Sequence, residues 1–342
     1  MSELTPLNAI GEFALINRLQ AGLTLRQPGS VLGIGDDAAI IRPTAGTELV
    51  MTTDLLVEGI HFDLSFCPLR HLGYKAVAVN VSDVAAMNAL PTQLVVALSV
   101  GPRFTVEAVE ELYAGLRLAC EAYNVDLVGG DTTASRGGLT LAITVLGEAP
   151  TGKAVRRSGG KPTDLLCVSG DLGGAFLGLQ VLEREKQAFM ADPETQPELA
   201  NYEYVVQRQL RPEARLDIVH ELRELGVHPT SMIDVSDGLA SEVLHLCAAS
   251  GTGARVFSEF LPLANPTLEA AAEFNLDPIT CALNGGEDYE LLFTVPVTDH
   301  EKIKNHPDIT ILGHLTGKEE GTNLITKAGQ PVPLKAQGWT SF

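Results

Sequence analysis

The sequence contains few cysteines, few aromatic residues and no long hydrophobic run. Its five cysteines are odd in number and widely spaced, and no CxxC pair occurs, so we expect reduced thiols rather than a disulfide framework or a zinc site. No apolar run approaches the roughly 18 residues of a membrane span. The first residues also lack the basic and apolar regions of a signal peptide. We therefore expect a cytoplasmic protein with no membrane partner.

Basic residues are also scarce. The 342 residues include 24 Lys and Arg against 43 Asp and Glu, which gives a formal net charge of −19. Such a charge disfavours binding to nucleic acid, because the phosphate backbone would be repelled. An acidic protein that binds phosphates needs metal ions or local cations to do so.

Several well-known motifs are absent. The sequence has no GxxxxGK[ST] phosphate loop, no GxGxxG after a strand, no HExxH and no GxSxG. The segment Asp234–Gly238 resembles the beginning of a calcium loop, but its twelfth position is His245 and not an acid, which excludes an EF-hand. These absences argue against a P-loop kinase, a dinucleotide-binding fold and the common hydrolases.

What is present fits a two-domain globular protein. Hydrophobic residues make up 45% and charged residues 20% of the chain, and its length suggests two domains at about 150 residues each. Residues 147–164 are rich in glycine, proline and basic residues and have little apolar periodicity. We place the boundary there, which predicts domains over 1–150 and 151–342.

Apolar periodicity predicts an α/β or α+β fold in both domains. In the first we expect strands at 31–35, 48–53, 93–100, 125–130 and 139–147 and a helix at 106–123. In the second we expect strands at 164–170, 289–295 and 309–315 and helices at 173–187, 212–226 and 236–251. Residues 72–89 read as helix, strand and second helix, and 188–203 as an exposed loop. The glycines of 170–179 favour close packing of a helix over anion binding.

Acidic residues recur where an apolar run ends in small residues. The pattern occurs six times, at Asp36–Asp37, Asp54, Asp83, Asp131, Asp234–Asp237 and Glu287–Asp288. Ligands of open α/β sheets lie beyond the carboxyl ends of strands, and several converging carboxylates need a cation between them. Oxygen ligands of this kind select Mg²⁺, which often bridges to substrate phosphates. The pattern therefore indicates phosphoryl transfer with several metal ions.

A plainer interpretation exists for each acid by itself. An Asp after Gly or Ser commonly caps a helix or forms a turn. Asp83 and Asp237 in particular fit the first turn of a helix. The metal interpretation depends on the six repetitions within one chain.

At these same residues the chain resembles the thiamine-monophosphate kinase family. The blocks that carry the resemblance are GEFALINRL (11–19), GIGDDAAII (33–41), TTDLLVEGIHF (52–62), LGYKAVAVNVSDVAAMNALP (72–91), LVGGDTT (127–133), RRSG (156–159), IDVSDGL (233–239), NGGEDYELLFTV (284–295) and the tail from Gly338 to Phe342. They occur in order and cover almost the whole chain. The tail departs from the family pattern, because Ser341 stands where His is common.

The resemblance implies a fold, an activity and a set of partners. The fold would have an N-terminal mixed-sheet domain that binds ATP and metal and pairs in a homodimer, and a C-terminal α/β domain that closes the cleft. The activity would be direct in-line transfer of the γ-phosphate of ATP to thiamine monophosphate, which yields thiamine diphosphate. Several Mg²⁺ ions would take part, and K⁺ is a further candidate.

The resemblance also implies roles for single residues. It places metal ligands at Asp37, Thr52, Thr53, Asp54, Asp83, Asp131, Asp234 and Asp237. It places ATP contacts at Tyr123, Gly130, Asp131, Arg157 and Ser236, and substrate contacts at His61, Glu287 and Trp339. Of these, Asp37, Asp83, Asp131 and Arg157 would act in catalysis.

Four of these residues have an alternative interpretation from the sequence alone. Tyr123 fits the core of a helix, and His61, which lies next to Phe62, fits a packed strand. Glu287 lies in a GGED turn, and Trp339 fits an anchor for the chain end.

Three alternative functions stay open at this point. They are another enzyme of the same wider ATP-using group that acts on a different acceptor, a binder of Mg-nucleotide or thiamine phosphate without catalysis, and a structural acidic protein.

Overall fold

The computed structural model describes residues 4–194 and 196–338, and the chain divides into two compact units. The first unit contains residues 1–84 and 89–153, and the second contains residues 85–88 and 154–342. Among the described residues, no helix combines the length and apolar character needed to cross a membrane. All five cysteines are buried free thiols, as expected.

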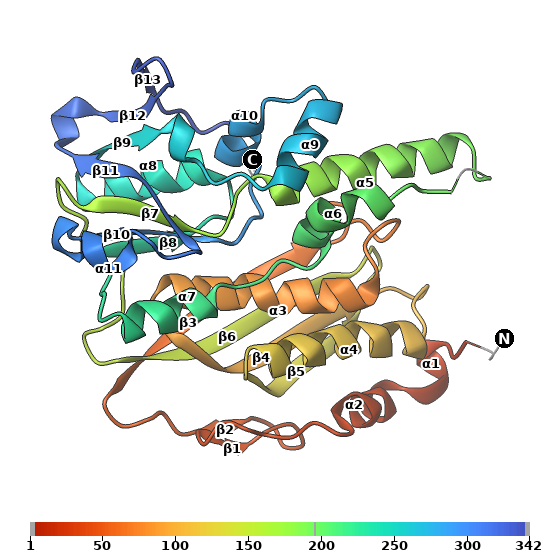
Figure 1. Cartoon of the computed structure of the whole chain (residues 1–342). Helices are drawn as coiled ribbons and strands as arrows, with labels where there is room; N and C mark the ends of the chain where they lie inside the picture. Colours follow the sequence, from red (N-terminus) through yellow and green to blue (C-terminus); the bar gives the residue numbers. More distant parts are fainter. Residues whose placement is uncertain (1–3, 195, 339–342) are drawn as a thin grey trace. The chain divides into compact units, whose positions relative to one another are not determined.

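A four-stranded mixed sheet forms the centre of the first unit. Its strands are β3 (Thr47–Val57), β6 (Thr140–Pro150), β4 (Leu90–Val100) and β5 (Asp126–Ala134), in that spatial order. Both β3 and β4 run antiparallel to β6, whereas β4 and β5 are parallel. Helices α3 (Leu69–Ala86) and α4 (Val106–Ala122) cover one face of the sheet (Figure 1). Among the described residues, no helix covers the opposite face.

The local sequence explains these elements. Along β6, the side chains of Leu141, Ile143 and Val145 are buried in turn, which is the period of two expected of a strand with one covered face. Helix α4 begins after Thr105, whose hydroxyl accepts a hydrogen bond from the backbone N–H of Ala108. Short elements precede the sheet: α1 (Leu7–Ile10), α2 (Glu12–Gln20) and a small antiparallel pair, β1 (Ser30–Leu32) and β2 (Ile40–Ile41).

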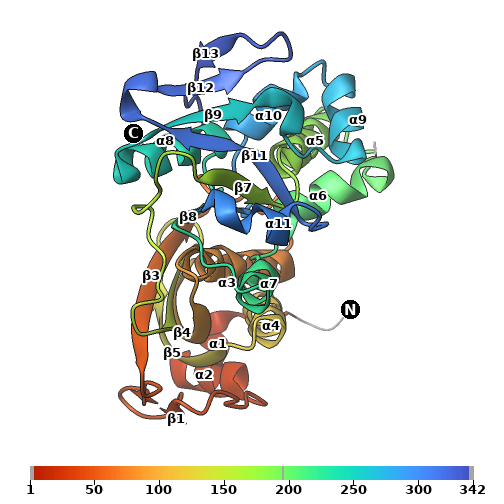
Figure 2. The same ribbon diagram turned by 60° about the vertical axis from the view of Figure 1, so that its left-hand side comes forward.

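A seven-stranded mixed sheet forms the centre of the second unit. Its spatial order is β13 (Pro331–Pro333), β12 (Thr322–Ile325), β9 (Gly253–Phe257), β11 (Ile309–Thr316), β7 (Leu165–Ser169), β10 (Leu291–Val295) and β8 (Ser231–Asp234). Among the described strand pairs of this second sheet, only β12–β9 is parallel. Figure 2 shows β9, β11 and β7 side by side near the middle of this sheet.

The second unit also contains helices. They are α5 (Gly174–Ala191), α6 (Glu203–Leu210), α7 (Leu216–Glu224), α8 (Leu239–Ser250), α9 (Asn265–Glu273), α10 (Pro278–Asn284) and α11 (His300–Ile303). In the part of the chain that the structure describes, 3-10 turns occur at Ala200–Tyr202, Ser258–Phe260, Val297–Asp299 and Lys318–Glu320. One apolar core joins β7, β8, β10 and β11 to α8, through residues such as Leu166, Ile233, Leu246, Leu292 and Leu312. A second cluster joins α5, α6, α9 and α10.

The two mixed sheets with flanking helices confirm the α/β fold class, but two local predictions are wrong. Residues 72–89 do not contain a strand, because α3 is one continuous helix through Val77, Val79 and Val81, which are all buried. A helix buried on all sides loses its amphipathic period, and a run of valines then favours a strand on propensity alone. Residues 188–203 are not simply a loop, since α5 extends to Ala191 and a 3-10 turn leads into α6.

Candidate active site

In the first unit, three of the predicted metal ligands lie together where β3 faces α3. Thr52 and Asp54 are two residues apart on β3, so their side chains share one face of the strand. The hydroxyl of Thr52 donates to Oδ2 of Asp83 at 2.5 Å. The backbone N–H of Asp54 donates to Oδ1 of Asn80, one helical turn before Asp83, at 3.0 Å. The strand and the helix thus hold oxygen atoms of two carboxylates and a hydroxyl in one place.

This arrangement is unfavourable for negative charge. Burial, together with the charge of Asp83, raises the pKa of Asp54 from 3.8 to about 6. Asp83 lies in the last turn of α3, where the carbonyl groups of the helix end also disfavour an acid. The interpretation of Asp83 as a first-turn acid is therefore wrong. A cation between these oxygens would relieve both effects.

Other predicted residues of the first unit lie elsewhere. The side chain of Thr53 lies on the opposite face of β3, where its hydroxyl donates to the carbonyl oxygen of Ile143 at 3.0 Å. Asp36 and Asp37 are exposed in the loop between β1 and β2, and the N–H of Asp37 donates to Oδ1 of Asp36 at 2.9 Å. Among the described residues, no group of three or more His, Cys, Asp or Glu could hold a metal ion by itself.

Gly130 and Asp131 lie on β5 and line a pocket of the first unit. The other side of this pocket is formed by Ile16, Leu19 and Gln20 of α2. Gly130 has a packing reason to be glycine, because a Cβ atom there would lie 2.1 Å from the carbonyl oxygen of Val96 on β4. Asp131 is exposed at the edge of this pocket.

In the second unit, the end of β8 carries three further predicted residues. Asp234 is buried at the last position of β8, and Ser236 and Asp237 follow in the turn before α8. Helix α8 begins at Leu239, and its N-cap residue is Gly238, which provides no side-chain hydrogen bond, so Asp237 is not the capping residue that the sequence allowed. Instead, Glu242 reaches back from α8 and accepts the N–H of Asp237 at 2.9 Å. Burial raises the pKa of the Glu242 carboxyl to about 7.

Glu287 lies beside this turn. Its N–H donates to the carbonyl oxygen of Ser236 at 2.7 Å, and its Oε2 accepts a hydrogen bond from Nε2 of Gln209 at 2.7 Å. A backbone hydrogen bond thus joins Glu287, a predicted substrate contact, to Ser236, a predicted ATP contact. Arg157 is exposed in the segment before β7, and its carbonyl oxygen accepts from the hydroxyl of Ser250.

The remaining predicted residues have varied surroundings. His61 is exposed in the turn after β3, where Nδ1 accepts the N–H of Val57 at 3.1 Å, so the interpretation as a packed strand histidine is wrong. Tyr123 ends α4, and its ring lies 5.9 Å from that of Tyr74, with the two hydroxyls 3.4 Å apart. Trp339 lies outside the described residues.

The comparisons with known proteins concern the family and the fold. The family model described as "AIR synthase related protein, N-terminal domain" matches residues 35–149, which contain the sheet of the first unit. A thiamine-monophosphate kinase of Aquifex aeolicus is 36% identical over 337 residues, which are 98% of this chain and 99% of that protein. The thiamine-monophosphate kinase of Escherichia coli K12 is 36% identical over 342 residues, with the same coverage.

The chain belongs to the thiamine-monophosphate kinase family. Among solved structures, the thiamine-monophosphate kinase of Stenotrophomonas maltophilia matches with a TM-score of 0.79 and 34% identity, and the match covers 94% of this chain and 98% of that one. A structure described as "AaThiL complexed with AMPPCP and TMP" matches with a TM-score of 0.76 and 32% identity over the full length of both chains. A hydrogenase maturation protein in complex with ATP, 20% identical, shares the fold with a TM-score of 0.75.

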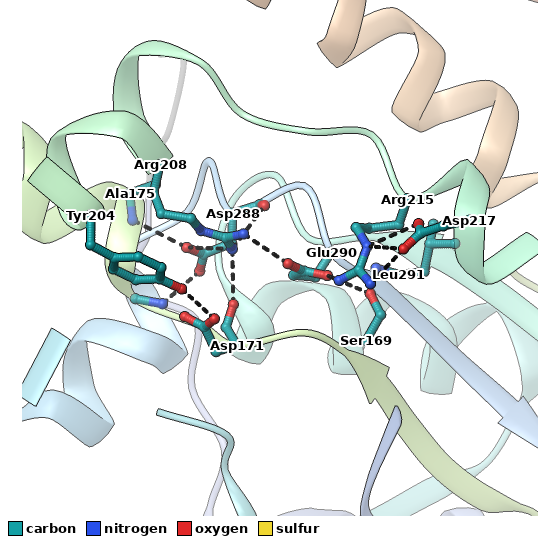
Figure 3. Close-up of polar contacts among 11 residues, drawn as sticks. Ser169, Asp171, Ala175, Tyr204, Arg208, Arg215, Asp217, Asp288, Glu290 and Leu291 are labelled. Atoms are coloured by element: carbon teal, nitrogen blue, oxygen red, sulfur yellow. Dashed lines mark hydrogen bonds and ion pairs between the residues drawn. The ribbon is translucent and has the colours of Figure 1, made fainter. Parts of the chain in front are cut away.

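In this member of the thiamine-monophosphate kinase family, sequence reasoning missed a buried ionic network in the second unit (Figure 3). Its centre is Glu290, which has no exposed surface and bonds to Arg208 at 2.9 Å, Arg215 at 2.6 Å and the hydroxyl of Ser169 at 2.5 Å. Asp288 accepts the N–H groups of Gly173 and Ala175 at the beginning of α5. From the sequence alone, the basic residues of 208–212 read as solvated or structural, and the acidic partners of Arg208 lie about 80 residues further along the chain.

Proposed function

We propose that this chain transfers the γ-phosphate of ATP directly and in line to the phosphate of thiamine monophosphate, with several Mg²⁺ ions held by its aspartates. Relatives named for this activity support the reaction. The relative solved with AMPPCP, an analogue of ATP, and with TMP supports the two substrates. The observation within this chain that carries the proposal is the crowding of Thr52, Asp54 and Asp83.

These residues fit a magnesium ion by the chemistry of their oxygens. Hard oxygen donors suit Mg²⁺, and a bound cation would counter the burial and the Asp83 charge that raise the pKa of Asp54. When bound, magnesium would neutralise and orient the ATP phosphates. In the second unit, Asp234 and Asp237 offer further carboxylates, and Asp37, Thr53 and Asp131 complete the proposed metal-binding set.

The chain's own residues divide the remaining work. Gly130, Asp131, Ser236 and Tyr123 would bind ATP, and the guanidinium of Arg157 would stabilise charge on the transferred group. The acceptor phosphate is largely ionised at neutral pH, since its second pKa is about 6, so no strong general base is needed. His61, Glu287 and Trp339 would bind thiamine monophosphate, where a carboxylate and an indole ring both suit the cationic heterocycle.

We also infer that the first unit pairs in a homodimer. The uncovered face of its sheet carries Leu49, Met51 and Leu55 on β3, with exposed fractions of 50%, 71% and 54%. Such an apolar patch is typical of an interaction surface. A light-scattering mass equal to one chain would contradict the pairing. The cytoplasmic location and the use of K⁺ stay predictions.

The proposal is tested by Asp83→Asn and Asp131→Asn. Each should lower turnover of thiamine monophosphate by at least about a thousandfold, which corresponds to about 4 kcal/mol, because a carboxylate that holds metal against phosphate is removed. Asp83→Asn should not lower the melting temperature, since it removes one of two repelling charges. The control is Glu111→Gln, which changes an exposed acid on α4. Near-normal turnover in both aspartate variants would contradict the metal-assisted mechanism.

A further inference from the structure

Helix α6 contacts the whole segment from Glu287 to Glu290 through two adjacent side chains. Arg208 bonds to the carboxylate of Glu290 at 2.9 Å and to the carbonyl oxygen of Asp288 at 3.3 Å (Figure 3). Gln209, the next residue, donates from Nε2 to Oε2 of Glu287 at 2.7 Å. The three acidic residues of this segment, Glu287, Asp288 and Glu290, are thus contacted from a helix about 80 residues earlier in the chain.

The backbone of this segment needs such support. Glu287 and Tyr289 have φ values of +59° and +53°, in the left-handed region that residues with a Cβ atom rarely adopt. Their N–H groups donate to the carbonyl oxygens of Ser236 and Val235, at 2.7 and 2.9 Å. The segment therefore follows the turn after β8 closely, and its conformation is fixed by contacts rather than by local preference.

The side chains at the end of the segment are anchored by charge. Asp288 accepts two N–H groups at the beginning of α5, and Glu290 lies between Arg208 and Arg215. Both carboxylates are buried, with exposed fractions of 1% and 0%. Their bonding partners include arginines and the N–H groups at the beginning of α5.

Glu287 is held differently. Its Oε2 is bound by the amide of Gln209, a buried side chain with an exposed fraction of 5%. An amide is a neutral donor, so it fixes the direction of the carboxylate without neutralising its charge. An arginine at position 209 would instead place a positive charge beside the carboxylate. The contact from Gln209 therefore sets the direction of the Glu287 carboxylate and brings no positive charge to it.

We propose that Gln209 is a positioning residue that holds the Glu287 carboxylate in the orientation that binds the cationic ring of thiamine monophosphate. The inference rests on the proposed function, in which Glu287 contacts this substrate. It adds a residue on α6 that touches no substrate and acts through Glu287.

The test compares Gln209→Met, which keeps the length of the side chain and removes the donor, with the wild-type chain. We expect the KM for thiamine monophosphate to rise about tenfold, while kcat and the KM for ATP change less than about twofold. A second variant, Gln209→Asn, keeps an amide that is too short to reach the Glu287 carboxylate, and it should change the constants in the same way. It provides the test if the Met variant does not fold. The control is Tyr204→Phe, which removes one hydrogen bond of the same helix, to Asp171, and should leave all three constants unchanged.

A double variant separates this claim from the proposed function. If Gln209 acts through Glu287, adding Gln209→Met to Glu287→Gln raises the KM no further. A rise with Glu287→Gln but not with either Gln209 variant would overturn the positioning role alone. Additive effects, or an equal rise of the KM for ATP, would overturn it too. If Glu287→Gln leaves the KM for thiamine monophosphate unchanged, the substrate role of Glu287 is overturned, and the inference with it.

Discussion

At the scale of single residues, Asp288 shows how burial and hydrogen bonding compete. Its carboxylate is buried, which raises its pKa, while Arg208 and the N–H groups of Gly173 and Ala175 lower it. Burial prevails, and the pKa rises from 3.8 to about 7. The beginning of α5 is therefore filled by a side chain of the protein itself, and the expected close packing, rather than anion binding, describes the glycines there.

The stability of the chain should depend on pH through this residue. Because the folded pKa is raised, the folded state holds a proton between about pH 4 and pH 7 that the unfolded state has lost. The free energy of unfolding should therefore fall as pH rises through that range, by up to about 1.4 kcal/mol per pH unit for this one group. Urea unfolding at several pH values measures the slope.

Asp288→Asn provides the matched comparison. The variant cannot ionise at position 288, so its free energy of unfolding should fall less steeply between pH 4 and pH 7 than that of the wild type, whatever its absolute stability. Equal slopes in the two proteins would show that Asp288 titrates at an ordinary pKa.

The sequence predicted some of these residues and could not predict others. Asp54 and Asp83 were recognisable because each follows an apolar run that ends in small residues. Glu290 and Arg208 were not, because their pairing depends on a fold that brings α6 beside a distant strand, and no local pattern records such a contact. The alternative interpretation of His61 as a packed strand histidine relied on its apolar neighbour Phe62. It was wrong because the strand ends at Val57, before His61.

At the scale of elements, α5 and α6 pack so closely that one position allows only glycine. A Cβ atom at Gly178 would lie 1.9 Å from the carbonyl oxygen of Val205 on α6. Neighbouring helices with such a contact must separate if a methyl group is added. This matters for the site because α6 also carries Arg208 and Gln209.

Gly178→Ala should therefore destabilise the chain despite the better helix propensity of alanine. Propensity favours alanine by about 1 kcal/mol, and overpacking costs up to about 3 kcal/mol, which leaves a net loss of about 2 kcal/mol. Denaturant unfolding measures this loss. The control is Gly137→Ala, because the nearest atom to a Cβ there is Oγ of Ser135 at 3.8 Å. A Gly178→Ala chain as stable as the control would contradict the close packing.

Elements with a clear period were predictable, and those without one were not. The amphipathic helix α4, the four strands of the first sheet and strands β7, β10 and β11 of the second followed from their patterns, whereas β8, β9, β12 and β13 were not predicted. Helix α3 did not, because its valines are buried on several sides and give no helical period. The same feature hid the position of Asp83, which the sequence placed in a first turn and the structure places in the last.

At the scale of the whole molecule, the two units contribute different parts of the proposed chemistry. The first unit carries the crowded oxygens of Thr52, Asp54 and Asp83, and the second carries Asp234, Asp237 and the segment around Glu287. Ordered blocks along nearly the whole sequence indicated the family, which the relatives confirm. The conformation of Glu287 was not predictable, because its left-handed backbone depends on Ser236 and Gln209.

The most direct test of the account measures ADP and thiamine diphosphate together. The chain is incubated with ATP and thiamine monophosphate, in Mg²⁺ and in EDTA, and again without thiamine monophosphate. We predict equal amounts of the two products in Mg²⁺ and neither in EDTA or without the acceptor. Folded protein that binds ATP but forms no thiamine diphosphate, or that forms it equally well in EDTA, would contradict the account.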